Sequence, residues 1–239
     1  RITLRPKTIV STSVMQQSTS TDGHMKKNPL KGMYFIFYNG IQAIGWSAFL
    51  YFIVCCAIKH GEQFYVHLYA ETYPLIRFFQ TLALLEVVHA VLGITSSKVG
   101  PVVLQTIGRL WFILGLLPAY TSLQQDPVTA VLLITYSMSE VIRYPYYICN
   151  EVELVPYFLH WLRYSAFIVL YPIGLSAEWL INYKSLEVVK AKPFITQPSN
   201  GLYYFVWALV VLHPMFALML LINMWKQRSR KLGSKSKKE

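Results

Sequence analysis

The stretch LRYSAFIVLYPIGLSAEW, residues 162–179, is apolar enough to lie in a membrane-spanning helix, yet it carries a tyrosine and a carboxylate. Tyr171 and Glu178 are seven residues apart, a spacing that turns an α-helix through about 700° and advances it by about 10 Å. We therefore expect both side chains on one face of the helix, two turns apart. Because an ionisable residue inside a membrane span is costly, this pair is a candidate functional site.

The whole chain has the composition of a membrane protein. Of its 239 residues, 54% are hydrophobic and only 14% are charged, whereas a soluble domain has about 25% charged residues. Six apolar runs come close to or exceed the roughly 20 residues that a helical span requires. They cover residues 33–58, 74–94, 101–120, 128–149, 155–183 and 201–225. We expect an all-α fold, a polytopic membrane protein built as a bundle of six transmembrane helices.

Proline residues indicate where four of these spans begin, because a missing N–H costs nothing in the first turn of a helix. The four are Pro74, Pro101, Pro127 and Pro156. Residues 198–201, Pro-Ser-Asn-Gly, are expected to close the one long loop.

Basic residues are concentrated at the two ends of the chain, whose net charge is +11. Six Lys and Arg lie at or before Lys31 and seven lie at or after Lys226, out of 22 in all. An even number of spans places both ends on one side, and the positive-inside rule makes that side cytosolic. We expect a disordered basic arm over residues 1–32, a six-helix domain over 33–225 and a basic cytosolic tail over 226–239.

The position of this charge also bears on partners. A soluble nucleic-acid-binding protein carries its basic residues on a folded surface, but here they flank apolar spans. They therefore indicate attraction to anionic membrane lipid and no nucleic-acid partner.

The three cysteines give no sign of a metal centre. Cys55, Cys56 and Cys149 all fall in apolar runs, without the spacing of a zinc motif or of a disulfide framework. We expect them to contribute to packing, and the sequence predicts no metal.

The fourth run contains charged residues that can neutralise each other. Glu140 and Arg143 are three residues apart, which makes them neighbours on a helix surface. Tyr136, Tyr144 and Tyr147 lie in the same run and are expected to donate hydrogen bonds.

Three other runs contain polar residues that need partners. Arg109 requires a carboxylate on another helix or an interface position. Arg163 lies near the start of its run, which favours a side chain that reaches the membrane interface. Glu86 and His89 are three residues apart and are expected to form a hydrogen-bonded structural pair.

The surroundings of the Tyr171–Glu178 pair differ from these, since no basic residue lies at helical spacing from it. Pro172 should bend the helix by freeing a backbone carbonyl. Gly174 lies between the two polar groups and supplies no side chain, which indicates room for a ligand. Ser176 is expected to add a hydroxyl near Glu178. The alternative is a tyrosine and a glutamate that bond only to neighbouring helices.

Four sequence runs occur in an order typical of one family. They are YNGIQAIGWS at 38–47, LEVVH at 85–89, SEVIRY at 139–144, and residues 162–178 with the pattern Leu-Tyr-Pro-x-Gly-x-x-x-Glu. Over about residues 33–230 the chain resembles the very-long-chain 3-hydroxyacyl-CoA dehydratases, also called protein-tyrosine-phosphatase-like or PASTICCINO-type. The phosphatase chemistry in that name is not expected, because no cysteine is followed by a glycine-rich loop and an arginine.

The resemblance implies a six-span lyase of the endoplasmic reticulum. It would remove water from a long-chain 3-hydroxyacyl-CoA in fatty-acid elongation, beside elongase and reductase partners, with no cofactor. The family's catalytic tyrosine and glutamate fall on Tyr171 and Glu178, with Gly174, Ser176, Glu140, Arg143 and Tyr144 as supporting residues. In one assignment Glu178 takes the C2 proton and Tyr171 protonates the leaving hydroxyl; the reverse assignment is also open.

Two other functions deserve comparison with this one. A catalytically silent scaffold for elongation-cycle enzymes is disfavoured by the intact Tyr171–Glu178 pair. A transporter is disfavoured because the chain shows no internal repeat of the kind common in that class.

Overall fold

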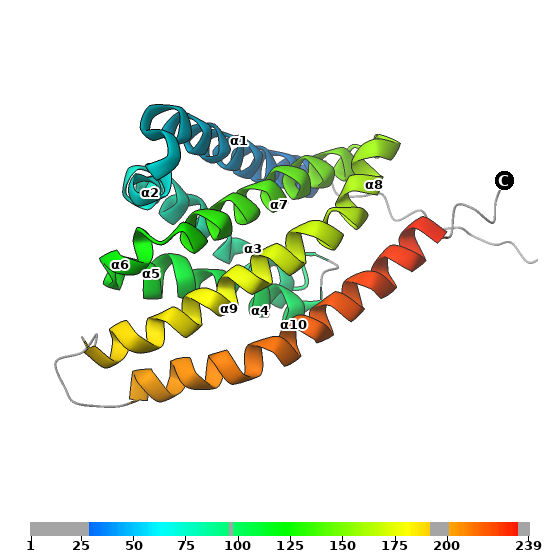
Figure 1. Ribbon diagram of the computed structural model, residues 1–239. Coiled ribbons are helices and arrows are strands. Elements are labelled where there is room, and N and C mark those ends of the chain that lie inside the picture. The colour runs from blue at the N-terminus through cyan, green and yellow to red at the C-terminus, as the bar shows by residue number, and fades with distance from the viewer. Residues whose placement is uncertain (1–28, 96–97, 192–200, 234–239) are drawn as a thin grey trace, which may run out of the picture.

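The computed structural model describes residues 29–95, 98–191 and 201–233, and within these ranges all regular secondary structure is helical (Figure 1). The predicted all-α class is therefore confirmed for the described part of the chain. The α-helices are α1 (Pro29–His60), α2 (Phe64–Leu82), α3 (Leu84–Val91), α4 (Val99–Leu110), α5 (Leu117–Ala119), α6 (Thr121–Gln124), α7 (Pro127–Glu151), α8 (Tyr157–Ser165), α9 (Phe167–Ala191) and α10 (Gly201–Gly233). A 3₁₀ turn, η1 (Gly61–Gln63), joins α1 to α2, and a π-helical segment, η2 (Trp111–Leu116), continues α4.

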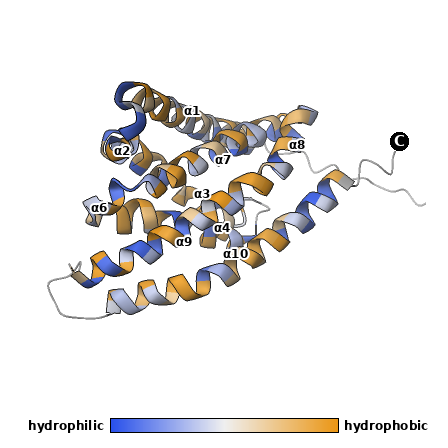
Figure 2. Ribbon diagram, in the orientation of Figure 1, coloured by the Kyte–Doolittle hydropathy of each residue, from blue (hydrophilic) through white to orange (hydrophobic). Residues whose placement is uncertain are grey.

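The chain is a multi-pass membrane protein by the length and hydropathy of its helices. Four helical segments among the described residues are long and apolar enough to cross a membrane: Pro29–Val91, Val99–Ala119, Tyr157–Ala191 and Gly201–Leu232. The first of these contains α1, α2 and α3, and α1 packs against α2. Hydrophilic residues gather at the turn between α1 and α2 and toward the C-terminal end of α10 (Figure 2).

The proline rule for helix starts holds at three of the four predicted positions. Asp126 caps α7 by accepting a hydrogen bond from the Val128 N–H at 2.9 Å, with Pro127 in the first turn. Pro156 directly precedes α8, and Pro101 lies in the first turn of α4. Pro74, in contrast, lies inside α2, which begins ten residues earlier at Phe64. The extra turns form because buried residues in this part of α2, Leu68 and Tyr69 among them, pack into the core.

The helix boundaries differ from several of the predicted ranges. The fifth run is not one helix, because Ala166 separates α8 from α9. Residues 29–32 belong to α1 and not to the arm, and residues 226–233 continue α10, since no proline interrupts either stretch after Pro29. The rest of the arm (1–28), the rest of the tail (234–239) and the loop residues 198–200 lie outside the described residues.

Helix α7 lies at the centre of the arrangement and contacts α1, α2, α8 and α9 (Figure 1). Fully buried apolar side chains fill the space between these helices; the largest are Trp46, Phe49, Leu68, Ile76, Leu132, Leu133 and Ile181. Helix α10 packs on α9 and α8 and leaves much of its apolar surface exposed. The central position of α7 allows its polar face to meet residues from several other helices.

Gly45 sets the distance between α1 and α2. A Cβ atom added at this buried glycine would lie 2.1 Å from ring carbons of Phe79. We expect Gly45→Ala to lower the free energy of unfolding by about 1 to 3 kcal/mol, the usual range for overpacking a core. Thermal unfolding in detergent measures this.

The matched control is Gly40→Ala on the same helix, where an added Cβ meets nothing within 4 Å. That variant should be neutral or gain up to about 1 kcal/mol, because alanine is the better helix former. Equal effects of the two substitutions would contradict the assigned role of Gly45.

Candidate active site

Helix α9 carries both members of the predicted pair. It runs without interruption from Phe167 to Ala191, and Pro172 lies within it. The seven-residue spacing therefore keeps Tyr171 and Glu178 on one face, about 10 Å apart along the axis. Both side chains are half-buried, so each remains within reach of a bound molecule.

Glu178 is held by residues from two neighbouring helices. The Tyr136 hydroxyl on α7 donates to Glu178 Oε1 at 2.7 Å, and His213 Nε2 on α10 lies 3.2 Å from Glu178 Oε2. The Glu178 side chain is still 19% exposed. Because a carboxylate has about four acceptor positions, these two contacts orient the group and leave it able to accept a proton.

Tyr171 has no such restraint. Its ring packs edge-on against Phe167, with centroids 6.0 Å apart. Among the described residues, no protein group hydrogen-bonds to its hydroxyl. Arg163, Arg109 and Arg143 act on this hydroxyl electrostatically. The arrangement leaves the phenol free to donate to a ligand.

The polar face of α7 carries a buried ion cluster. Glu140 pairs with Arg109 of α4 and, at 2.7 Å, with Arg143. Arg143 also pairs with Glu86 of α3 at 2.8 Å, and Tyr144 donates to Glu86 at 2.6 Å. The predicted Glu140–Arg143 pair, the hydrogen bond from Tyr144 and an interhelical carboxylate for Arg109 are all confirmed.

The ion cluster extends to the partner of Glu178. The Arg109 guanidinium lies over the Tyr136 ring, 4.6 Å from its centroid, and donates to Ser139 Oγ at 2.9 Å. The Tyr136 hydroxyl in turn donates a hydrogen bond to Glu178. One chain of contacts thus runs from the ion pairs to the candidate catalytic carboxylate.

The predicted Glu86–His89 pair is wrong. Glu86 turns to α7, because Arg143 shares Glu140 with Arg109 and two guanidinium groups need two carboxylates. His89 instead bonds to the Tyr34 hydroxyl of α1 at 2.7 Å.

Arg163 lies among tyrosine rings, and its position at the membrane interface stays a prediction. Its guanidinium donates to the Tyr147 hydroxyl at 3.3 Å and lies 5.7 Å and 5.9 Å from the ring centroids of Tyr147 and Tyr164. Helix α8 packs on α7, which brings the Tyr147 side chain to this charge.

Gly174 faces α7, and Ser176 lies on an exposed face of α9. A Cβ atom at Gly174 would lie 2.9 Å from Thr135 Cγ2, so the space that the sequence left empty is occupied by α7. Ser176 is exposed and lines a surface groove with Val131 and Pro172. Two residues turn a helix by about 200°, which places Ser176 on the face away from Glu178.

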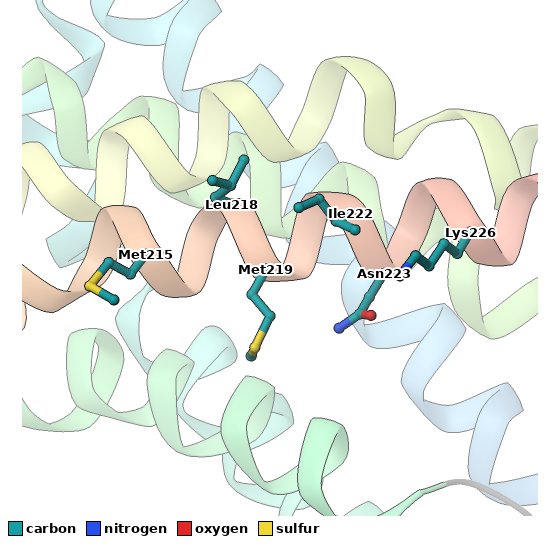
Figure 3. A pocket seen from close by; sticks show the side chains of 6 residues that line it. All are labelled: Met215, Leu218, Met219, Ile222, Asn223 and Lys226. Carbon is teal, nitrogen blue, oxygen red and sulfur yellow. The ribbon is translucent and has the colours of Figure 1, made fainter.

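A second surface pocket lies along α10 (Figure 3). Its lining residues are Met215, Leu218, Met219, Ile222, Asn223 and Lys226. Ile222 is nine residues from His213, a rotation of about 900°, so the pocket faces away from the side of α10 that meets Glu178. This pocket is lined mostly by apolar side chains and ends at Lys226. It is better suited to contact with a lipid than to binding the reacting part of a substrate.

Sequence reasoning missed the roles of two residues. The sequence predicts that Tyr136 donates a hydrogen bond but does not indicate Glu178 as its partner, and it predicts no role for His213. A histidine in the middle of an apolar run needs a polar partner, which was the available signal. The position of His213 in the sequence does not show which carboxylate is its partner.

The fold and the site define a helical membrane protein with a candidate acid–base pair between its helices. A family model described as "Protein tyrosine phosphatase-like protein, PTPLA" matches residues 80–234. The chain belongs to this family. No solved structure matches it.

Three relatives of this chain are named as very-long-chain (3R)-3-hydroxyacyl-CoA dehydratases. The chain is 35% identical over 215 residues to "Very-long-chain (3R)-3-hydroxyacyl-CoA dehydratase hpo-8" of Caenorhabditis elegans, which covers 86% of this chain and 97% of the relative. It is 33% identical over 162 residues to "Very-long-chain (3R)-3-hydroxyacyl-CoA dehydratase 2" of Homo sapiens, covering 68% of this chain and 63% of the relative. A "Probable very-long-chain (3R)-3-hydroxyacyl-CoA dehydratase" of Schizosaccharomyces pombe is 35% identical over 158 residues, 65% of this chain and 74% of the relative.

Proposed function

We propose that this protein is a hydro-lyase that converts a very-long-chain 3-hydroxyacyl-CoA to the trans-2-enoyl-CoA in fatty-acid elongation. The observation that carries the proposal is the Tyr171–Glu178 pair on one face of α9, in a chain that aligns with 97% of a relative named as such a dehydratase. The substrate has a polar head and a long apolar tail, which suits a site between apolar helices.

The chemistry requires one base and one acid on the same substrate. Glu178 takes the C2 proton, and the C–H electron pair forms the C2–C3 double bond. The C3–O bond breaks, and the hydroxyl leaves as water with the proton of Tyr171. Proton return from Glu178 to Tyr171, directly or through water, restores the pair. The reverse assignment, with a protonated Glu178 as acid, uses the same atoms.

The surrounding charges suit the first assignment. The three guanidinium groups that act on Tyr171 offset part of the cost that burial and the Glu140 carboxylate impose on the phenolate formed when it gives up its proton. Tyr136 and His213 hold the Glu178 carboxylate in one orientation, which keeps its free positions directed at the substrate. No resident cofactor enters any of these steps.

The proposal is tested with protein purified in detergent and supplied with long-chain 3-hydroxyacyl-CoA. Mass spectrometry should detect the enoyl-CoA and an equal loss of substrate. A folded protein that turns over no chain length would overturn the enzyme assignment and favour the scaffold. Because detergent removes the sealed compartment that transport needs, turnover also separates the enzyme from a transporter.

Tyr136 is a positioning residue in this account. Tyr136→Phe removes one hydrogen bond to a carboxylate, a contact that contributes about 1.5 to 3 kcal/mol. We expect kcat to fall about 10- to 100-fold with little change in KM, because the buried Tyr136 hydroxyl is bonded to Glu178. Steady-state kinetics measure the effects on kcat and on KM separately.

The matched control is Tyr204→Phe on the exposed face of α10, which is 62% accessible and should keep wild-type kinetics. A Tyr136→Phe variant that changes only KM, or nothing, would remove Tyr136 from the site.

We further propose that the chain crosses the membrane six times, with both termini in the cytosol. The spans correspond to α1, α2 with α3, α4 with η2 and α5, α7, α8 with α9, and α10. The basic residues near both chain ends support this orientation. We place the protein in the endoplasmic-reticulum membrane, in contact with lipid and with elongase and reductase enzymes.

A further inference from the structure

The turn between α1 and α2 brings together side chains that bind metals. Cys56 and His60 are four residues apart on α1, and His67 and Glu71 are four residues apart on α2. Residues at this spacing share one helix face. The 3₁₀ turn η1 reverses the chain between the helices, so the two faces meet.

The distances within this group are short. The ligand atoms of Cys56, His60 and Glu71 all lie within 4.8 Å of one another. His60 Nε2 is 2.8 Å from Glu71 Oε1, and the His67 ring stacks on the His60 ring with centroids 4.1 Å apart. Ligands of a tetrahedral zinc ion, at about 2.0 to 2.3 Å from the metal, are about 3.5 Å from each other. Side-chain movements of about 1 Å therefore suffice.

We propose that Cys56, His60 and Glu71 bind a Zn²⁺ ion that fastens α1 to α2. A thiolate, an imidazole and a carboxylate are the three ligand types that zinc accepts in proteins. Water or His67, after its ring leaves the stack, fills the fourth position. Cys56 is buried at 2% exposure, whereas the Glu71 side chain is 37% exposed, so the ion enters from the Glu71 side.

The contacts of these residues show what a bound ion displaces. Lys59 Nζ and His60 Nε2 both contact the same Glu71 oxygen, at 2.7 Å and 2.8 Å. The Cys56 thiol donates to the Phe64 carbonyl at 3.6 Å. On binding, the thiol gives its proton to solvent, its sulfur bonds to zinc, and Lys59 loses its carboxylate partner. Lys59 is thus a competitor of the metal. None of these residues contacts the Glu178 site.

The test uses the full chain, purified without a polyhistidine tag, stripped with a chelator and titrated with Zn²⁺ against a coloured competitor. We expect one bound equivalent. Co²⁺ in place of Zn²⁺ should give the thiolate-to-metal charge-transfer absorption and the visible bands of a four-coordinate site. Cys56→Ser should abolish the charge-transfer band, and His60→Ala and Glu71→Gln should each weaken binding at least tenfold.

Two further variants serve as controls. Cys55→Ser, at the neighbouring cysteine, should keep both the stoichiometry and the charge-transfer band. Lys59→Ala should bind zinc more tightly than the wild type, because the competing ammonium is gone. No bound equivalent in the wild type, or retention of the band in Cys56→Ser, overturns the proposal. Neither result bears on dehydratase activity.

Discussion

Replacing Tyr171 by phenylalanine, or Glu178 by glutamine, is expected to reduce dehydration at least about 100-fold, the scale of a lost general acid or base. Each substitution removes one proton-transfer group and keeps the size of the side chain. Tyr171 has no protein hydrogen bond among the described residues, so its loss should leave the fold intact. Initial rates with saturating substrate measure the effect.

The controls come from the same helix. Tyr183→Phe and Glu187→Gln change exposed side chains of α9 and should retain wild-type rates. Loss of activity in these variants too would attribute the effect to damage of α9 and not to chemistry at the pair.

Glu140→Gln is expected to be the most destabilising of the single substitutions in the bundle. Its fully buried carboxylate is the shared partner of Arg109 and Arg143. Removing it leaves two guanidinium groups with only the Glu86 carboxylate, and breaking a buried ion pair in this way costs about 3 to 5 kcal/mol. The shift of the thermal unfolding midpoint in detergent measures the loss.

A double substitution separates charge from packing. Arg109→Met combined with Glu140→Gln should be less destabilising than the sum of the two single changes, because both sides of one ion pair are then absent. Additive effects would mean that the two residues are not coupled. Glu187→Gln, an exposed carboxylate, should stay within about 0.5 kcal/mol of the wild type.

What the sequence predicted well depends on short-range geometry. The all-helical class, the Asp126–Pro127 helix start and the Glu140–Arg143 pair all follow from spacings of a few residues. The shared face of Tyr171 and Glu178 follows from helix geometry once α9 is continuous. The placement of Ser176 near Glu178 failed although the same geometry, about 200° for two residues, argues against it.

What the sequence did not show depends on which helices meet. Glu178 lies 42 residues from Tyr136 and 35 from His213, and no local rule selects those partners. Glu86 bonds to Arg143, 57 residues away, and not to His89. The contact of Thr135 with Gly174 also depends on the packing of α7 on α9. Such contacts depend on which helices pack against each other in the complete bundle.

The most direct test of the account is single-turnover formation of the enoyl-CoA by four purified proteins: wild type, Tyr171→Phe, Glu178→Gln and the double variant. If the two residues act in one step, each single variant is at least about 100-fold slower than the wild type, and the double variant is about as slow as the slower single one. Turnover near the wild-type rate by either folded single variant would contradict the assignment of Tyr171 and Glu178 as the catalytic pair.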